Sequence, residues 1–231
     1  QILPPTPVRQ ADATGDIVGR VSPNRYYTPA NQVLTPAGLQ VELPGMRPQA
    51  LALSPDGRLL ATAGKTHDLV LLEPQSGKIL HRVLLPPERD RDPAPGPVSD
   101  HILQPDKEGQ LSFTGLTFSP DGSRVYLANV NGSIKVFGVE KNGRVAGLFT
   151  ISLPPANAPG RQAEIPAGLA ASADGRRLYV ALNLANRLAE MDTATGKLLH
   201  LWEVGVAPYD VVIAGHKAYV SNWGGRRPDA D

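Results

Sequence analysis

The sequence predicts an all-β fold, a β-propeller made of four-stranded antiparallel blades. Glycine and proline, at 23 residues each in a chain of 231, favour short strands and tight turns over long helices. A unit of two successive hairpins also recurs along the chain, and one such unit corresponds to one propeller blade. These two observations define the expected fold class.

The first hairpin of each unit turns at an Asp-Gly pair or its equivalent. Apolar runs flank this turn in four segments, residues 51–63, 116–129, 169–183 and, with a shortened turn, 210–222. Asp accepts hydrogen bonds from backbone N–H groups there, and Gly adopts the positive φ that the return strand requires. Asp56, Asp121 and Asp174 could resemble a set of catalytic carboxylates, but turn capping explains both their identity and their spacing.

The second hairpin of each unit turns at a further glycine, at Gly77, Gly143 and Gly196. We therefore expect complete blades at residues 49–85, 113–153 and 167–204. A further blade begins at Tyr209 and stops after its second strand, near Asn222. Because a propeller closes only when its last blade meets its first, we expect this chain to be the N-terminal part of a longer protein, with seven blades when complete. A second polypeptide that completes the ring is the alternative.

Two insertions separate the blades, at residues 86–110 and 154–166. Connections after the second and the fourth strand of a blade emerge at the same end. The two insertions and residues 223–227 should therefore lie on one face, opposite the Asp-Gly turns. Before the first complete blade, residues 1–15 are expected to form an arm, and residues 16–231 the blades. A degenerate blade is expected near Arg25–Asn31, with outer strands at residues 32–36 and 39–43 joined by a turn at Gly38.

Several of these segments resemble the family of YVTN-repeat propellers. Tyr179-Val-Ala-Leu-Asn183 and Tyr219-Val-Ser-Asn222 are variants of its Tyr-Val-Thr-Asn signature, and the Ser-Pro-Asp-Gly and Asp192-Thr-Ala-Thr-Gly-Lys197 turns are typical of it. The resemblance covers about residues 16–227. It implies the propeller fold.

A narrower resemblance involves residues 205–228 and Phe113-Thr-Gly115. These segments are similar to bacterial proteins that fuse a YVTN propeller to a phosphoesterase domain of the alkaline phosphatase superfamily. In such proteins the metal ligands and the nucleophile belong to the C-terminal domain, which nothing here matches. The resemblance therefore implies a phosphoesterase domain as a partner, but no catalytic residue in this chain.

Composition and motifs limit the other functions. A net charge of +1 argues against nucleic acid as the main partner, and no apolar run is long enough for membrane insertion. Cysteine is absent, which excludes thiolate chemistry. No nucleophile, phosphate-binding or metal-ligand motif is present, so we expect no catalytic residue, no metal and no cofactor. The histidines are interpreted as structural or solvent-exposed: His67, His81, His101, His200 and His216.

The face that carries the insertions is the expected binding surface, because function concentrates on loops held by a rigid scaffold. Asn129, Asn183 and Asn222 end second strands on this face, where capping of a turn is an equal alternative to ligand binding. Trp223, Arg226 and Arg227 are the most suggestive cluster, since exposed Trp and Arg favour recognition. The candidate residues are Asn129, Arg161, Asn183, Tyr209, Asn222, Trp223, Arg226 and Arg227.

The preferred function is that of a non-catalytic binding or scaffold propeller that positions a partner or a fused phosphoesterase domain. The alternatives are a lactonase- or cycloisomerase-type propeller enzyme and a structural surface-layer module. The sequence starts at Gln1, for which a cleaved secretory signal is one explanation and shortening of the chain is another. We expect a periplasmic or extracellular location.

Overall fold

A computed structural model describes residues 10–11, 17–88, 105–156 and 158–225. The chain divides into two units, residues 1–42 and 43–231. Each unit is described by itself below. Among the described residues, no helix is long and apolar enough to cross a membrane.

The first unit contains a small antiparallel sheet of four strands in sequence order, β1 (Gln10–Ala11), β2 (Ile17–Ser22), β3 (Arg25–Tyr27) and β4 (Val33–Leu34). Its β3 and β4 fall in the two segments for which strands were expected, but the second expected outer strand, at residues 39–43, is wrong. The flanking Pro36 and Pro44 have no N–H to donate to a ladder, and Leu39 is 61% exposed rather than packed. Of the expected N-terminal arm, only Gln10 and Ala11 are described, and they pair with β2.

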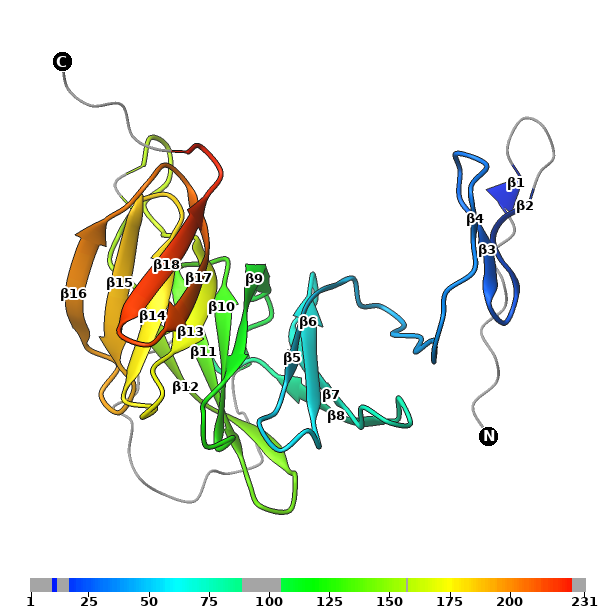
Figure 1. The fold of residues 1–231 in the computed structure, drawn as a ribbon, viewed down its shortest axis with the longest axis horizontal. Helices are drawn as coiled ribbons and strands as arrows, with labels where there is room; N and C mark the ends of the chain where they lie inside the picture. The colour runs from blue at the N-terminus through cyan, green and yellow to red at the C-terminus, as the bar shows by residue number, and fades with distance from the viewer. Residues whose placement is uncertain (1–9, 12–16, 89–104, 157, 226–231) are drawn as a thin grey trace. The chain divides into compact units, whose positions relative to one another are not determined.

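The second unit confirms the three complete blades and the incomplete one (Figure 1). Each complete blade is a four-stranded antiparallel sheet in sequence order. The first is β5 (Pro48–Leu53), β6 (Leu60–Gly64), β7 (Asp68–Leu72) and β8 (Ile79–Leu84); the second is β9 (Leu111–Phe118), β10 (Arg124–Asn129), β11 (Ser133–Val139) and β12 (Val145–Ser152); the third is β13 (Pro166–Ala171), β14 (Arg177–Leu182), β15 (Arg187–Asp192) and β16 (Leu198–Glu203). A two-stranded sheet follows, β17 (Pro208–Ala214) and β18 (Lys217–Asn222).

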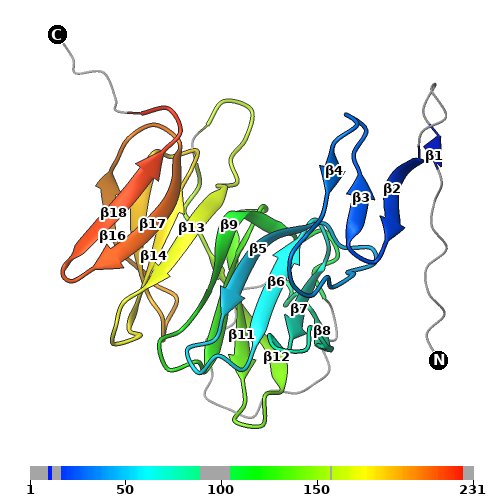
Figure 2. The ribbon, with the colours of Figure 1, turned by 45° about the vertical axis from the view of Figure 1, so that its right-hand side comes forward.

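The first strands of successive blades lie side by side, in the order β5, β9, β13 and β17 (Figure 2). Glycine permits this close approach at two positions. A Cβ on Gly115 would lie 2.1 Å from the carbonyl oxygen of Ala167, and one on Gly168 would lie 2.1 Å from Oδ1 of Asp210. Both distances are far below van der Waals contact, so these positions exclude a larger residue unless the strands separate.

Each first strand carries a bulge near its beginning. The bulge in β9 is the largest, because Leu111 pairs with Asn129 and Leu116 pairs with Leu127. Within it, Phe113 has a φ of +50°, which is unusual for a residue with a side chain. A smaller bulge in β17 lies between Pro208 and Asp210. Bulges re-aim side chains away from the regular alternation of a strand, and these two direct aromatic residues toward one another.

Apolar clusters between neighbouring blades form the core. One joins the blade β5–β8 to the blade β9–β12 and includes Val83, Leu85 and Phe137. The other joins the blade β9–β12 to the blade β13–β16 and includes Ile151, Leu178 and Met191. Each blade therefore covers the outer strands of the blade before it.

Candidate functional site

The Asp-Gly turns lie at one end of the blades and repeat the same hydrogen bonds. In each, a serine hydroxyl donates to the aspartate Oδ1 over 2.5–2.6 Å: Ser54 to Asp56, Ser119 to Asp121, and Ser172 to Asp174. The same oxygen accepts a backbone N–H two residues further on, over 3.0 Å. Turn capping is thus confirmed as the role of these carboxylates. We call this end, defined by residues 54–59, 119–124 and 172–177, the turn end.

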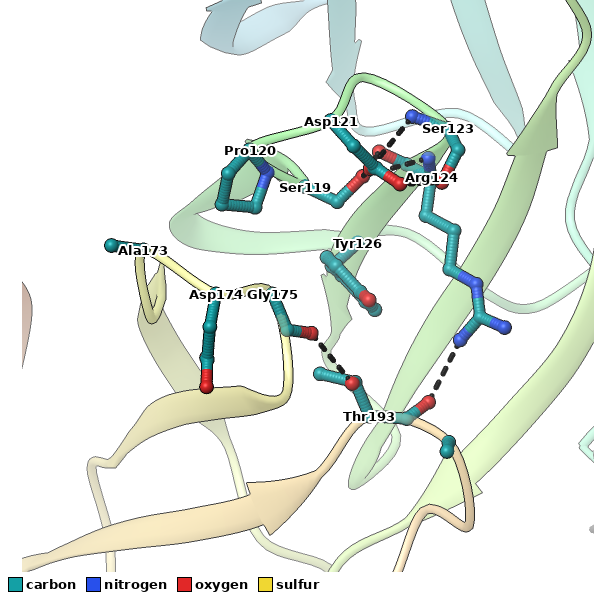
Figure 3. Close-up of a pocket in the computed structure, with 11 residues that line it drawn as sticks. Ser119, Pro120, Asp121, Ser123, Arg124, Tyr126, Ala173, Asp174, Gly175 and Thr193 are labelled. Atoms are coloured by element: carbon teal, nitrogen blue, oxygen red, sulfur yellow. Dashed lines mark hydrogen bonds between the residues drawn. The ribbon is translucent and has the colours of Figure 1, made fainter.

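A pocket of about 270 Å³ lies at the turn end, between the second and third complete blades (Figure 3). Tyr126 lies at its centre, and Nη1 of Arg124 donates to the carbonyl oxygen of Thr193 over 2.8 Å. The hydroxyl of Thr193 in turn donates to the carbonyl oxygen of Gly175 over 2.7 Å. The lining residues are Ser119, Pro120, Asp121, Ser123, Arg124, Tyr126, Ala173, Asp174, Gly175, Thr193 and Ala194.

Three ionisable groups of this pocket have shifted pKa values, namely Asp121, Asp174 and Tyr126. The Ser119 hydroxyl is the main cause of the lowered pKa of Asp121, and the Ser172 hydroxyl is the main cause of the lowered pKa of Asp174. Burial raises the pKa of Tyr126, so its phenol stays neutral. The pocket therefore offers carboxylates and hydroxyl groups for hydrogen bonding.

Sequence reasoning did not predict this pocket. Aligning the Asp-Gly turns places Arg124 and Tyr126 where the first complete blade has Leu59 and Ala61. The sequence did contain a signal for the pocket: Arg124 and Tyr126 are polar where the neighbouring repeat is apolar.

The connections after second and fourth strands meet at the opposite end, as predicted for their described parts. Oδ1 of Asn129 accepts the N–H of Gln110 over 3.0 Å, and Oδ1 of Asn186 accepts the N–H of Ala207 over 2.8 Å. Arg161 donates from Nη2 to the carbonyl oxygen of Val130. We call this end, with residues 65–67, 86–88, 105–113, 130–132, 154–156, 158–165, 183–186, 204–209 and 223–225, the insertion end. Residues 89–104, Arg226 and Arg227 lie outside the described residues.

A buried lysine anchors both stems of the first insertion. Lys135 of β11 is fully buried, and its Nζ lies 2.9 Å from Oε1 of Glu88 and 2.9 Å from Oδ2 of Asp106. It also donates to the carbonyl oxygen of Pro86 over 2.8 Å. Burial raises the pKa of Asp106, but hydrogen bonding and charge from Lys135 lower it, and the net pKa lies below the ordinary value. This network stabilises the base of the insertion.

A buried glutamate orders the second insertion. The carboxylate of Glu164, 1% exposed, accepts N–H groups of Ile165, Leu184 and Ala185 over 2.8–3.1 Å. Burial is the largest influence and raises the pKa of Glu164, although these bonds and Arg161 lower it in part. The side chain thus joins the insertion to the loop between β14 and β15.

Three aromatic side chains converge at the insertion end. The Tyr209 and Trp223 rings stack, with centroids 4.5 Å apart and planes at 24°. The Phe113 ring meets both edge-on, at 5.6 Å from Tyr209 and 5.1 Å from Trp223. Trp223 is nonetheless 62% exposed. We call these three residues the aromatic cluster; Tyr209 and Trp223 were candidates from the sequence, and the structure adds Phe113.

The other described candidates make hydrogen bonds within the scaffold. Asn129 is fully buried, and its Nδ2 donates to the hydroxyl of Ser133 over 3.0 Å and to Glu88. Nδ2 of Asn183 donates to the carbonyl oxygen of Pro208 over 3.0 Å. Asn222 donates to the carbonyl oxygen of Val220, while its own Oδ1 is buried without a hydrogen bond. The bonds of Asn129, Asn183 and Arg161 thus link connections of neighbouring blades, whereas Asn222 bonds within its own strand β18.

The described histidines lie apart from one another. Nδ1 of His67 lies 3.2 Å from the carbonyl oxygen of Gly109, and Nδ1 of His200 lies 2.7 Å from Oε2 of Glu190. His216 is exposed and His81 is half-buried, while His101 is outside the described residues. In the part of the chain that the structure describes, no group of three or more His, Cys, Asp or Glu side chains could hold a metal ion.

Comparison with solved structures identifies the architecture. The chain is similar to the β-propeller domain of Cps50 (Swd1) from Myceliophteria thermophila, with a TM-score of 0.57 and 13% identity, over 89% of this chain and 61% of that one. The fold is that of a β-propeller. U3-55K (TM-score 0.55) and the RRP9 WD40 repeats (0.54) are also similar, each at 14% identity over 74% of this chain. This chain spans 44% and 43% of those two structures, respectively.

At these identities the likeness extends to the fold alone. No protein-family model matches the sequence, and a search of curated proteins gives no match. The propeller scaffold is therefore established by structure, and the function must be argued from the site.

Proposed function

We propose that this chain is a non-catalytic binding propeller of the YVTN-repeat type, from an exported bacterial protein. Its aromatic cluster binds a phosphoesterase domain of the alkaline phosphatase superfamily. The propeller positions that domain, and the chemistry belongs to the domain. The polar pocket at the turn end is not part of this contact.

The convergence of Phe113, Tyr209 and Trp223 is the observation that carries the proposal. Phe113 lies in the segment Phe113-Thr-Gly115, and the other two lie within residues 205–228. These are the two segments that resemble propellers fused to a phosphoesterase domain, and they are far apart in sequence. Their meeting at one place on the insertion end supports a shared role in binding.

The geometry of the aromatic cluster suits a protein partner. Stacking on Tyr209 restricts the Trp223 ring before any partner arrives, so little side-chain entropy remains to be lost on binding. The large exposed area of Trp223 is then available for burial. Exposed Trp and Tyr residues of this kind are the usual centres of binding energy in interfaces.

Binding of a purified phosphoesterase domain, taken from one of the resembling fusion proteins, tests the proposal. Isothermal titration calorimetry should detect saturable binding to the wild-type chain, and Trp223→Ala should weaken it by at least about tenfold, as expected for a central contact. Trp202→Ala is the matched control, since Trp202 is also partly exposed, at 42%, but lies on β16. Absence of binding, or an equal loss in both variants, would refute the proposal.

The non-catalytic character is tested separately. Purified chain should hydrolyse neither a phosphodiester nor a lactone faster than buffer does. Turnover that a single substitution abolishes, for example Tyr126→Phe in the turn-end pocket, would instead support the propeller-enzyme alternative.

A further inference from the structure

The pocket at the turn end is a concave site with a buried floor and an exposed rim. Its walls belong to the second and third complete blades, so its shape depends only on blades that the structure describes in full. Ser119, Tyr126 and Thr193 are buried in its floor, whereas Asp121 and Asp174 are exposed at its rim (Figure 3). Its volume of about 270 Å³ is close to the lower limit for pockets that enclose a small organic molecule.

Arg124 and Arg177 occupy the same position of successive repeats, but only Arg177 is neutralised within its own blade. Nη1 of Arg177 lies 2.9 Å from Oδ2 of Asp192, and its Nε lies 3.3 Å from Oε1 of Glu190. Both acidic residues lie on the neighbouring strand, β15. The corresponding positions of β11 carry no charged side chain; they are Gly138 and Val136. Arg124 forms no salt bridge with any residue in the described part of the chain.

Two neutral groups hold the Arg124 side chain at the pocket. Nη1 donates to the carbonyl oxygen of Thr193 over 2.8 Å, and Cζ lies 5.8 Å from the centroid of the Phe149 ring. Because neither group carries a formal charge, the guanidinium keeps a full positive charge and has N–H donors left for a ligand. A carboxylate fits such a fork of donors best, since it can accept two parallel N–H bonds.

The carboxylates of the rim can bind a positively charged group. In Asp121 and in Asp174, Oδ1 accepts a serine hydroxyl and a backbone N–H. Within the described ranges, Oδ2 of Asp121 accepts one further bond, from the Ser123 hydroxyl over 2.8 Å, and Oδ2 of Asp174 accepts none. A carboxylate has about four acceptor sites, so both side chains can accept further N–H groups. Their lowered pKa values keep both ionised near neutral pH.

We propose that the turn-end pocket binds a small zwitterion of the α-amino-acid class. The ligand carboxylate pairs with the guanidinium of Arg124, and the ligand ammonium group binds the carboxylates of Asp121 and Asp174. A simple anion would meet the two carboxylates, and a simple cation would meet the guanidinium, so only a ligand with both charges matches the site. An aliphatic ligand side chain would contact the apolar part of the lining, namely Pro120, Ala173 and Ala194. The proposal is independent of the aromatic cluster, which lies at the opposite end of the blades.

Three ligands that share one carbon skeleton test the requirement for both charges. L-Valine is a zwitterion, 3-methylbutanoate lacks its ammonium group, and isobutylamine lacks its carboxylate. In an NMR titration of the ¹⁵N-labelled full chain, L-valine should cause saturable shifts at the amides of residues 119–126, 173–175 and 193–194, but not at residues 54–59. Each of the other two ligands should bind at least about tenfold more weakly, because each leaves an ionised group of the pocket unpaired.

The titrations also define the results that would overturn the proposal. Absence of saturable shifts with L-valine would overturn it, as would equal binding of 3-methylbutanoate or isobutylamine. Shifts of the same amides with D-glucose, where L-valine causes none, would overturn it in favour of a site for a neutral polyol.

Two matched pairs of variants locate the binding. Arg124→Gln should weaken L-valine binding at least about tenfold, whereas Arg177→Gln, at the equivalent position outside the pocket lining, should leave it unchanged. Asp174→Asn should also weaken binding, and Asp56→Asn, in the equivalent turn of the first complete blade, should not. The second pair remains decisive if Arg124→Gln fails to fold, because the Oδ1 of asparagine can still accept the serine hydroxyl. Equal losses in both members of a pair, or unchanged binding by Arg124→Gln, would overturn the proposal.

Discussion

The two ends of the blades stabilise the same fold in different ways. At the turn end, three turns repeat one set of short-range bonds, from serine to aspartate and from aspartate to the backbone. At the insertion end, each junction between blades uses different residues: Lys135 at one, Glu164 at the next, and Asn186 after that. The repeat therefore specifies the turn end locally, while the insertion end depends on contacts between residues far apart in sequence.

The comparison of the two ends predicts the largest loss of stability for substitution of the buried Lys135. Lys135→Met leaves Asp106 with its carboxylate buried, 7% exposed, and without its cation. Breaking a buried ion pair from one side costs about 3–5 kcal/mol, so urea denaturation should show a loss of that order. Lys135→Met combined with Asp106→Asn should recover part of it. A single variant as stable as the wild type would show that the network does not stabilise the insertion end.

The close approach of the first strands of neighbouring blades predicts the next largest loss of stability, at Gly168. Gly168→Ala places a methyl group against Asp210 of β17, and overpacking of this kind costs about 1–3 kcal/mol. Gly138→Ala is the control, because its nearest contact is the flexible Leu148 side chain at 3.2 Å. Thermal unfolding should rank Gly168→Ala well below Gly138→Ala in stability. The opposite ranking would mean that β13 and β17 can separate freely.

At the turn end we expect three small and equal losses of stability. Ser54→Ala, Ser119→Ala and Ser172→Ala each remove a hydroxyl that donates to the aspartate and accepts a backbone N–H. We expect each to lose about 1 kcal/mol in urea denaturation. Ser76 makes the same two kinds of bond, to Glu73 and from the N–H of Lys78, but in an exposed turn where water can replace them, so Ser76→Ala should change stability by less than about 0.5 kcal/mol. Widely different losses at the three serines would show that the turns are not equivalent.

The last effect is the dependence of stability on acidic pH, to which several carboxylates contribute: the folded pKa values of Asp56, Asp106, Asp121, Asp174 and Asp192 are lowered, and that of Glu164 is raised. The folded pKa of Asp106 is lowered, so its stabilisation is complete above the unfolded value of 3.8 and is lost as pH falls through the folded value. The folded pKa of Glu164 is raised, so its contribution is present below the unfolded value of 4.5 and is lost as pH rises through the folded value. Because the lowered aspartates outnumber the raised Glu164, denaturation followed between pH 3 and 7 should show stability falling at the acidic end, and Lys135→Met should flatten that acidic limb by removing the contribution of Asp106.

The same contrast explains what could be predicted from the sequence. Asp-Gly turns between apolar runs predicted the three complete blades, and a shortened turn at Gly215 predicted the hairpin β17–β18, because the turn chemistry acts within a few residues. The alternation of loop ends also placed the insertions opposite Asp56, Asp121 and Asp174. In the first unit, where the repeat is degenerate, the expected strand at residues 39–43 was wrong.

The site was less predictable than the fold. Tyr209 and Trp223 were recognised as candidates, but their contact with Phe113 depends on a bulge in β9 that no local pattern indicates. The buried roles of Asn129 and Lys135 depend on insertion stems that are distant in sequence. The polar pocket around Tyr126 forms only where two blades meet, so no single repeat indicates it.

Hydrogen–deuterium exchange of the chain with and without the phosphoesterase domain tests the central claim most directly, because it compares both ends in one measurement. The account predicts slower exchange at residues 111–115, 207–213 and 223–225, around the aromatic cluster, and unchanged exchange at residues 54–59, 119–124 and 172–177 of the turn end. Protection confined to the turn end, or no protection at saturating domain, would contradict the assignment of the aromatic cluster as the binding site.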